Sequence, residues 1–522
     1  MLLNPRSVAA VATVGALAVL AAACGGSGDA ADVGLSKSGA PTPTIVPSAT
    51  EPALPPPTPT YVSVFDEPGE SSPKVGEFVV ELPEPTPTFD PGEVILPTVV
   101  ALTVEFPDLL DAELRVRLDE IEPGVAALRG LYAVADTNRR FITQAELEER
   151  LAVDLAKQRE EFDALGRLYE VLGITEPGTD LYELFLDIYS SSVLGFFDPE
   201  LNELYVVDDD ASELSPQDHL TYIHEFVHAL QQQHFDIGAV FDSEELKNNS
   251  DRSAAYRALV EGDATLLETI YMFQKMTAEE QASAQDLGVD LSSFFASPHL
   301  IQRTFLFPYL EGAQFVLQVF ADSGWKGVNA LYDRAPVSTE QVIHSAKYRL
   351  TEPPIEVEVP EVVDVLGEGW SELLRDTFGE FALVAYLEDF LSRDQAAIAG
   401  AGWGGDRYVL YGGPDGSDLL VHSLAWDSVG DAAEFFGAFA GFTEVRLQTE
   451  WELLDGAGSA VRMTLSNQVI FAVNRGTTTD LIFAPDDSTL AAVLGELDPD
   501  FEFPSVAATD GPDTGSATST EP

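Results

Sequence analysis

The sequence has little cysteine, little lysine and little positive charge of any kind. Its 522 residues include one Cys, and 27 Lys and Arg stand against 88 Asp and Glu, for a formal net charge of −61. One cysteine excludes an internal disulfide and any metal site built from several cysteines. A charge this negative repels phosphate backbones and anionic lipid surfaces, so we expect no nucleic-acid partner.

Long apolar runs are also scarce. After the N-terminus no segment reaches the roughly 18 uninterrupted apolar residues of a membrane span, so no transmembrane helix is expected. The one early run, residues 8–23, follows Arg6 and has the length of a secretory signal core. It resembles a bacterial lipoprotein signal (residues 1–24), in which Cys24 becomes the lipidated first residue. The alternative is an ordinary signal peptide cleaved near Ala23. Both predict export.

Composition divides the rest of the chain into a tether, a globular part and a tail. Residues 25–103 are rich in Pro and Thr, which favour extended polyproline geometry and predict a disordered tether. Hydrophobic residues make up 45% of the chain, enough to build cores. We assign a body to residues 104–350 and a smaller domain to residues 351–506, followed by a low-complexity tail at 507–522.

Apolar periodicity predicts an α+β fold with a mainly helical body. The helical pattern covers residues 108–189, where Leu114, Leu118 and Ile121 recur at helix spacing, and most of residues 216–350. Between these regions, residues 193–207 form two apolar runs around a Pro/Asn turn, which is typical of a β-hairpin. After about residue 400, strand-like segments with Gly-rich turns alternate with helices and indicate a small α+β domain.

The residues that carry chemistry lie in one predicted helix. Ser215, Pro216 and Asp218 form a strong helix start, with an N-cap, a proline at the first helical position and a capping box. His224 and His228 are four residues apart, so they share one helix face about 5–6 Å from each other. That spacing allows two imidazoles to bind one zinc ion.

Glu225 lies about 100° around the same helix from His224. A carboxylate there can take a proton from water at the metal without occupying a coordination position. The residues from His224 to His228 therefore form the His-Glu-x-x-His pattern of zinc metallopeptidases. The alternative is a buried helix whose histidines are satisfied by solvent.

Two residues compete for the position of third zinc ligand. His234 has the metzincin spacing, ten residues after His224, but Gln231 stands where that pattern needs a glycine to turn the chain. Glu261 follows His228 by 33 residues, and a Glu from a second helix is the gluzincin solution. A buried acid among the apolar residues around position 261 needs a cation. We favour Glu261, which leaves His234 a supporting or substrate-side role.

Three stretches together resemble a known group. These are Leu194-Gly-Phe-Phe-Asp-Pro-Glu200, the run from His224 to Asp236, and Ala258-Leu-Val-Glu-Gly-Asp-Ala264. They are similar to exported bacterial zinc-metallopeptidase-like proteins of gluzincin type, which are mostly uncharacterised. The resemblance extends to Phe307-Pro-Tyr-Leu-Glu-Gly312 and to residues 338–344, so it covers about residues 105–350 and, more weakly, the C-terminal domain. It implies a zincin-like body and peptidase-like zinc chemistry, and it implies no particular substrate.

These patterns suggest further roles. His344 is our candidate for stabilising the oxyanion, with Tyr309 and Tyr256 as weaker ones and pairing of His344 with Glu340 as the structural alternative. Asp263 is a candidate for orienting a ligand histidine, although a surface acid needs no special role. The predicted hairpin would supply an edge strand on which an extended peptide could pair.

The sequence therefore predicts a lipid-anchored, extracytoplasmic zinc metallopeptidase with one Zn²⁺ per chain, held by His224, His228 and Glu261. Its location would be the cell surface or the outer face of the cytoplasmic membrane, and its partner a peptide or protein substrate. The alternative is a non-catalytic, metal-binding surface lipoprotein for adhesion or ligand capture. The presence of Glu225 favours the enzyme, because a metal-binding scaffold has no need of a base.

Overall fold

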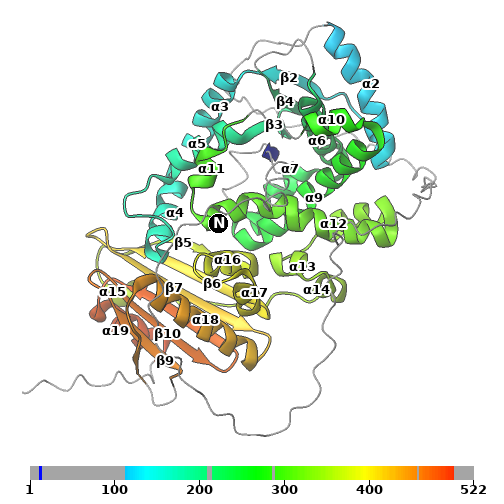
Figure 1. The fold of residues 1–522 in the computed structure, drawn as a ribbon. Helices are drawn as coiled ribbons and strands as arrows, with labels where there is room; N and C mark the ends of the chain where they lie inside the picture. The colour runs from blue at the N-terminus through cyan, green and yellow to red at the C-terminus, as the bar shows by residue number, and fades with distance from the viewer. Residues whose placement is uncertain (1–10, 15–111, 209–213, 285–288, 455–457, 499–522) are drawn as a thin grey trace, which may run out of the picture. The chain divides into compact units, whose positions relative to one another are not determined.

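The computed structural model describes residues 11–14, 112–208, 214–284, 289–454 and 458–498. From residue 112 onward these residues belong to one compact unit. The predicted tether, the tail, Cys24 and most of the predicted signal peptide lie outside the described residues. The described chain is an α+β protein, as predicted (Figure 1). No helix among the described residues is both long and apolar enough to cross a bilayer.

The first half of the described chain is mainly helical and contains a small mixed sheet (Figure 1). The strand order is β1-β3-β4-β2, in which β3 pairs antiparallel with β1 and β4, and β2 runs parallel to β4. Its elements are β1 (Val11–Val14), α2 (Ala112–Arg129), β2 (Asn138–Ile142), α3 (Gln144–Ala156), α4 (Arg159–Leu172), α5 (Leu181–Ser192), β3 (Val193–Asp198), β4 (Glu203–Val207), α6 (Pro216–Phe235), α7 (Ile237–Phe241), α8 (Glu244–Lys247), α9 (Ser250–Lys275), α10 (Ala278–Ser283), α11 (Ser292–Ala296), α12 (His299–Asp333), α13 (Thr339–Ile343) and α14 (Ser345–Leu350).

The predicted hairpin is confirmed, because β3 and β4 pair antiparallel around the turn that includes Pro199. One strand corrects the sequence interpretation. Residues 138–142 fall within the region expected to be helical, and they form β2, which buries Phe141 and Ile142. A five-residue strand has too few positions to show a period, and its partner β4 lies more than 60 residues away in sequence.

The second half is built on a seven-stranded antiparallel sheet with the order β5-β6-β7-β11-β10-β9-β8. Tyr408 and Leu410 of β6 enter one hydrophobic core with residues of α16 and α18, while Val409 and Tyr411 enter another with residues of α15 and α19. Helices thus cover both faces. The elements are α15 (Val363–Leu366), β5 (Ser371–Asp376), α16 (Gly379–Leu387), α17 (Arg393–Gly400), β6 (Trp403–Gly412), β7 (Asp418–Trp426), α18 (Val429–Leu447), β8 (Glu452–Leu453), β9 (Ala460–Thr464), β10 (Val469–Arg475), β11 (Thr478–Ala484) and α19 (Asp487–Leu497).

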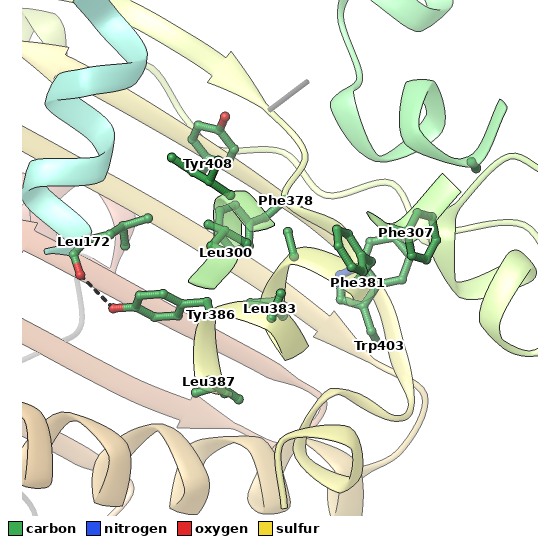
Figure 2. Close-up of a cluster of buried hydrophobic side chains, with 14 of the residues drawn as sticks. Leu172, Leu300, Phe307, Phe378, Phe381, Leu383, Tyr386, Leu387, Trp403 and Tyr408 are labelled. Carbon is green, nitrogen blue, oxygen red and sulfur yellow. Dashed lines mark hydrogen bonds between the residues drawn. The ribbon is translucent and has the colours of Figure 1, made fainter. Parts of the chain in front are cut away.

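One hydrophobic core contains residues from both predicted domains. Figure 2 shows Leu172 of α4 and Phe307 of α12 in a cluster with side chains of α16 and β6. The rings of Phe307 and Phe381 lie 4.2 Å apart between centroids. The Tyr386 hydroxyl donates a hydrogen bond of 3.0 Å to the carbonyl of Leu172 (Figure 2). The helical region therefore packs directly on the sheet.

A carboxyl group of the sheet region caps a helix of the helical region, and a second cap lies within the helical region. Asp376 of β5 accepts from the backbone N–H of Ser250 at the start of α9, at 2.8 Å. Asp251 of α9 accepts in turn from the N–H of Thr339 at the start of α13, at 3.1 Å. A carboxyl oxygen at a helix N-terminus satisfies N–H groups that have no partner within the helix. These caps hold the beginning of α9, the helix that carries Glu261.

The helices α9 and α12 touch backbone to backbone. A Cβ added at Gly262 would lie 2.4 Å from the carbonyl carbon and oxygen of Gly312, and one added at Gly312 would lie 2.3 Å from the oxygen of Ala258. Real Cβ atoms do not approach other atoms so closely, so this crossing requires glycine at both positions. The contact sets the separation between Glu261 on α9 and Tyr309 on α12.

We expect Gly262→Ala to lower the free energy of unfolding by about 1–3 kcal/mol, because the added methyl group overpacks a backbone contact that cannot yield. Urea denaturation measures the change. Gly437→Ala in α18 is the matched control, since no atom lies within 4 Å of a Cβ built there. Alanine at that exposed helical position is expected to be neutral or stabilising by up to about 1 kcal/mol. Equal losses in the two variants would contradict the packing argument.

Candidate metal centre

The helix α6 begins as the sequence predicts and runs without a break through the glutamines. The Ser215 side chain accepts from the backbone N–H of Asp218, whose carboxylate accepts from the N–H of Ser215, with Pro216 at the first helical position. The helix ends at Phe235, and Asp236 follows in the left-handed conformation with φ of 50°. All residues from 220 to 231 are buried, so α6 is a central helix.

His224, His228 and Glu261 come together in the interior. His224 Nε2 lies 3.2 Å from Glu261 Oε2, and His228 Nε2 lies 3.4 Å from the same oxygen. The potential ligand atoms of the three residues all lie within 4.8 Å of one another, and all three side chains are buried. The structure thus brings together the three ligands that the sequence predicts, and this group could hold a metal ion.

A second set of contacts orients both imidazoles. His224 Nδ1 lies 3.0 Å from Glu268 Oε2, and a carboxylate there accepts from Nδ1–H. His228 Nδ1 lies 2.7 Å from Gln231 Oε1. The carbonyl of Val260 can only accept, so the Gln231 amide nitrogen, 3.0 Å away, must face it and leave the amide oxygen for His228. Each Nε2 is thereby directed at Glu261, as metal-binding histidines require.

The contacts of Gln231 continue into a buried ionic network. Its amide nitrogen also lies 3.1 Å from Asp263 Oδ2. The guanidinium of Arg129 donates two hydrogen bonds to Asp263, of 2.7 and 2.8 Å, and the Tyr332 hydroxyl donates a third of 2.8 Å. Arg129 is fully buried at the end of α2 and lies over the ring of Trp325 at 4.5 Å. Asp263 therefore supports His228 through Gln231.

The charges of the cluster stabilise one another. Burial would lower the pKa of His224, but its hydrogen bonds to Glu261 and Glu268 raise that pKa to about 10. Burial would raise the pKa of Glu261, but the charge of His228 and the hydrogen bond with His224 lower that pKa to about 2. These pKa shifts favour a charged Glu261 carboxylate and a proton on His224. A divalent cation would replace that proton.

The ring nitrogen of His228 that faces Glu261 is a further feature that fits a metal ion. His228 Nε2 is buried and makes no hydrogen bond within the described part of the chain, although it faces the Glu261 carboxylate. A buried nitrogen without a hydrogen bond costs free energy, and coordination would remove that cost. Two imidazole nitrogens and one carboxylate oxygen are ligands typical of divalent transition metals.

Glu225 lies beside the cluster on α6 and is fully buried. The strand β3 passes close to it, because a Cβ added at Gly195 would lie 3.3 Å from Glu225 Cγ and only 2.8 Å from the carbonyl oxygen of Tyr205. The absence of a side chain at Gly195 therefore lets β3 approach the helix that carries the ligands. An extended peptide along β3 would pass close to Glu225.

The other predicted residues have different surroundings. His234 is exposed, and its Nε2 lies 2.8 Å from the carbonyl of Tyr132, so it takes no part in the metal cluster. His344 Nε2 lies 2.8 Å from Glu380 Oε1, and within the described residues His344 makes no hydrogen bond to the cluster. Glu340, the alternative partner of His344, pairs with Lys347 instead.

Of the two tyrosines named as weaker candidates, only Tyr309 contacts the cluster. Its ring centroid lies 6.2 Å from that of His224. Tyr256 packs edge-on against Phe241, with 5.0 Å between centroids. Sequence reasoning missed Glu268, whose spacing of seven residues from Glu261 places both acids on one face of α9. It also missed the role of Gln231, three residues after His228.

Comparisons with known proteins reach the C-terminal sheet alone. A family model described as a domain of unknown function (DUF8575) matches residues 369–494, which run from just before β5 into α19. No curated protein and no solved structure matches the chain. The metal cluster on α6 and α9 lies outside the matched residues.

We expect Gln231→Leu to weaken metal binding by about 10- to 100-fold, because His228 Nδ1 loses its acceptor and the ring is no longer held in place. A competition titration against a chromogenic chelator measures the affinity. Gln233→Leu is the control, since that neighbouring side chain bonds the backbone of Val134 and Ala135. A Gln231→Leu chain that binds metal as tightly as the control would show that His228 needs no such support.

Proposed function

We propose that this chain is a zinc metallopeptidase with a zincin-like helical body. The observation that carries the proposal is the buried group of His224, His228 and Glu261 with Glu225 beside it. Two histidines and one glutamate are the protein ligands of many catalytic zinc sites, in which a fourth position stays open. Zinc bound here would supply Lewis acidity, which polarises a peptide carbonyl and acidifies water.

Side chains of the protein would transfer the proton, orient the ligand imidazoles and stabilise the oxyanion. Glu225 accepts a proton from the attacking water and delivers it to the amine that leaves. Glu268 and Gln231 hold the two imidazoles in place through their Nδ1 atoms. Tyr309, beside His224, is now our first candidate for donating a hydrogen bond to the oxyanion, ahead of His344, which pairs with Glu380.

The edge of β3 supports a peptide as substrate. Residues Val11–Val14 pair with it antiparallel as β1, with Thr13 opposite Gly195 and Val11 opposite Phe197. This edge therefore accepts an extended chain next to Glu225. Removal of the predicted signal peptide would free the same edge for a substrate, bound by main-chain hydrogen bonds. Export and lipid anchoring through Cys24 belong to the proposal and rest on the sequence alone.

The test is a cleavage assay with the purified mature chain, loaded with zinc, on a broad panel of unfolded proteins and peptides. We expect cleavage that a chelator abolishes and added zinc restores, because the ligands hold the metal reversibly. If the zinc-loaded chain cleaves nothing on the panel, the peptidase proposal fails. The non-catalytic metal-binding lipoprotein then becomes the better account.

A further inference from the structure

Arg257 on α9 differs from the other cations of the described residues. Arg257 is partly buried, and its Nε is fully buried without an acceptor. Its side chain makes no hydrogen bond or ion pair with any residue that the structure describes. The other described Arg and Lys residues without such a partner, Arg117, Lys275 and Lys326, are exposed to water. Among the described residues, Arg257 is therefore the one partly buried Arg or Lys whose side chain makes neither a hydrogen bond nor an ion pair.

The composition makes this position unusual. The chain has 88 acidic residues for 27 basic ones, so a carboxylate is seldom far from a guanidinium. Arg252, one turn earlier on the same helix, pairs with Glu245 at 2.7 Å. A buried N–H without an acceptor lowers stability, so packing alone gives no reason for an arginine at position 257.

The surroundings of Arg257 are aromatic. Its guanidinium carbon lies 5.1 Å from the ring centroid of Phe241 on α7. Burial raises the pKa of Tyr189 on α5, and the positive charge of Arg257 opposes that rise, which places the two side chains close together. A guanidinium among aromatic rings is poorly hydrated, so it attracts an incoming anion more strongly than an exposed arginine does.

Arg257 also lies on the side of α9 that faces the metal cluster. It precedes Glu261 by four residues, so both are on one face of α9, and Arg257 is one turn nearer the start of the helix. Its neighbour α7 packs under the β3–β4 turn, because a Cβ at Gly238 would lie 3.0 Å from Pro199. Tyr189 lies four residues before the first residue of β3, so the contacts of Arg257 lie near both ends of this strand, whereas Glu225 lies beside Gly195.

A peptide bound on β3 would have a defined direction. A strand that pairs with β3 as β1 does has its amino-terminal end toward the turn, since Val11 is opposite Phe197 and Thr13 is opposite Gly195. At about 3.3 Å per residue, its side chains would extend along the whole length of β3.

We propose that Arg257 forms a subsite for a carboxylate side chain of the substrate. The proposal rests on the peptidase function proposed above and adds the class of substrate: peptides with Asp or Glu near the cleaved bond. A bidentate bond from the guanidinium would orient the peptide on β3 and satisfy the arginine.

The test uses zinc-loaded mature chain and quenched fluorescent peptides that differ only in Glu or Gln at one position, moved stepwise along the sequence. We expect wild type to favour Glu in kcat/KM by about 10- to 100-fold at one position near the cleaved bond, mainly through KM. Arg257→Gln should bring this ratio close to one, and Arg257→Glu should favour Lys at the same position. Arg117→Gln, at an exposed and unpaired arginine, should keep the wild-type ratio.

Wild type that cleaves with no preference for Glu, or Arg257→Gln that keeps the preference, would overturn the subsite. The subsite would also be overturned if wild type preferred Glu only in peptides with a free C-terminus and not in peptides with an amidated one. If Arg257→Gln does not fold, the preference for Glu over Gln is measured in Arg257→Lys instead. Lysine keeps the positive charge but cannot form the bidentate hydrogen bonds. A wild type that cleaves no peptide defeats the peptidase proposal. The subsite is then tested by binding: fluorescence anisotropy compares the affinities of the Glu and Gln peptides for zinc-loaded Glu225→Gln. Equal affinities would overturn the subsite.

Discussion

Replacing Glu225 by glutamine is expected to lower peptide hydrolysis by about 10²–10⁴-fold while metal binding stays as in wild type. Glutamine keeps the size of the side chain and removes the base. Glu225 is buried on α6 beside the metal cluster and is not one of the three residues whose ligand atoms converge. The substitution therefore leaves the ligands intact and separates catalysis from metal binding.

The measurement compares kcat/KM and metal content for wild type, Glu225→Gln and Glu434→Gln, the last being an exposed acid on α18. The control should match wild type in both quantities. Hydrolysis by Glu225→Gln at the wild-type rate would show that another group is the base. Loss of metal together with activity would mean that Glu225 is a ligand.

The second large effect concerns the third ligand. Glu261→Ala is expected to reduce metal occupancy sharply, because the carboxylate oxygen that faces both Nε2 atoms is removed. His234→Ala is expected to keep wild-type occupancy, because His234 is exposed and bonds the carbonyl of Tyr132. Elemental analysis of the dialysed variants measures both.

The pair of variants also distinguishes two classes of metal site. Equal occupancy in Glu261→Ala and wild type, with loss in His234→Ala, would assign the chain to the three-histidine, metzincin-like arrangement. A Glu261→Ala protein that fails to fold is resolved by Glu261→Gln, which keeps the volume and a neutral oxygen near the histidines. We expect this variant to bind metal more weakly than wild type.

Local sequence patterns predict the part of the site that depends on helix geometry. The cap at Ser215 and the spacing of His224 and His228 follow from one turn of helix and need no knowledge of the fold. The choice of Glu261 over His234 rests on Gln231, where no left-handed turn occurs, and α6 indeed continues to Phe235. These features are encoded within a few residues of each other.

Features that depend on distant contacts are harder to predict. From the sequence alone, Gln231 indicates only that the chain does not turn there. In the structure it links His228 to Asp263 on another helix. His344 lies in a polar segment that looks suitable for a site, and its partner Glu380 is 36 residues away on α16. The strand β2 exists because β4 offers a free edge. In each case the deciding partner belongs to another element.

The most direct test of the central claim is the metal content of the purified mature chain after reconstitution with excess Zn²⁺ and dialysis. The account predicts about one zinc per chain, retained by wild type and lost on treatment with a strong chelator, because three buried ligand atoms converge on one point. A folded chain that retains no zinc would contradict the assignment of His224, His228 and Glu261 as a metal centre, and with it the proposed enzyme.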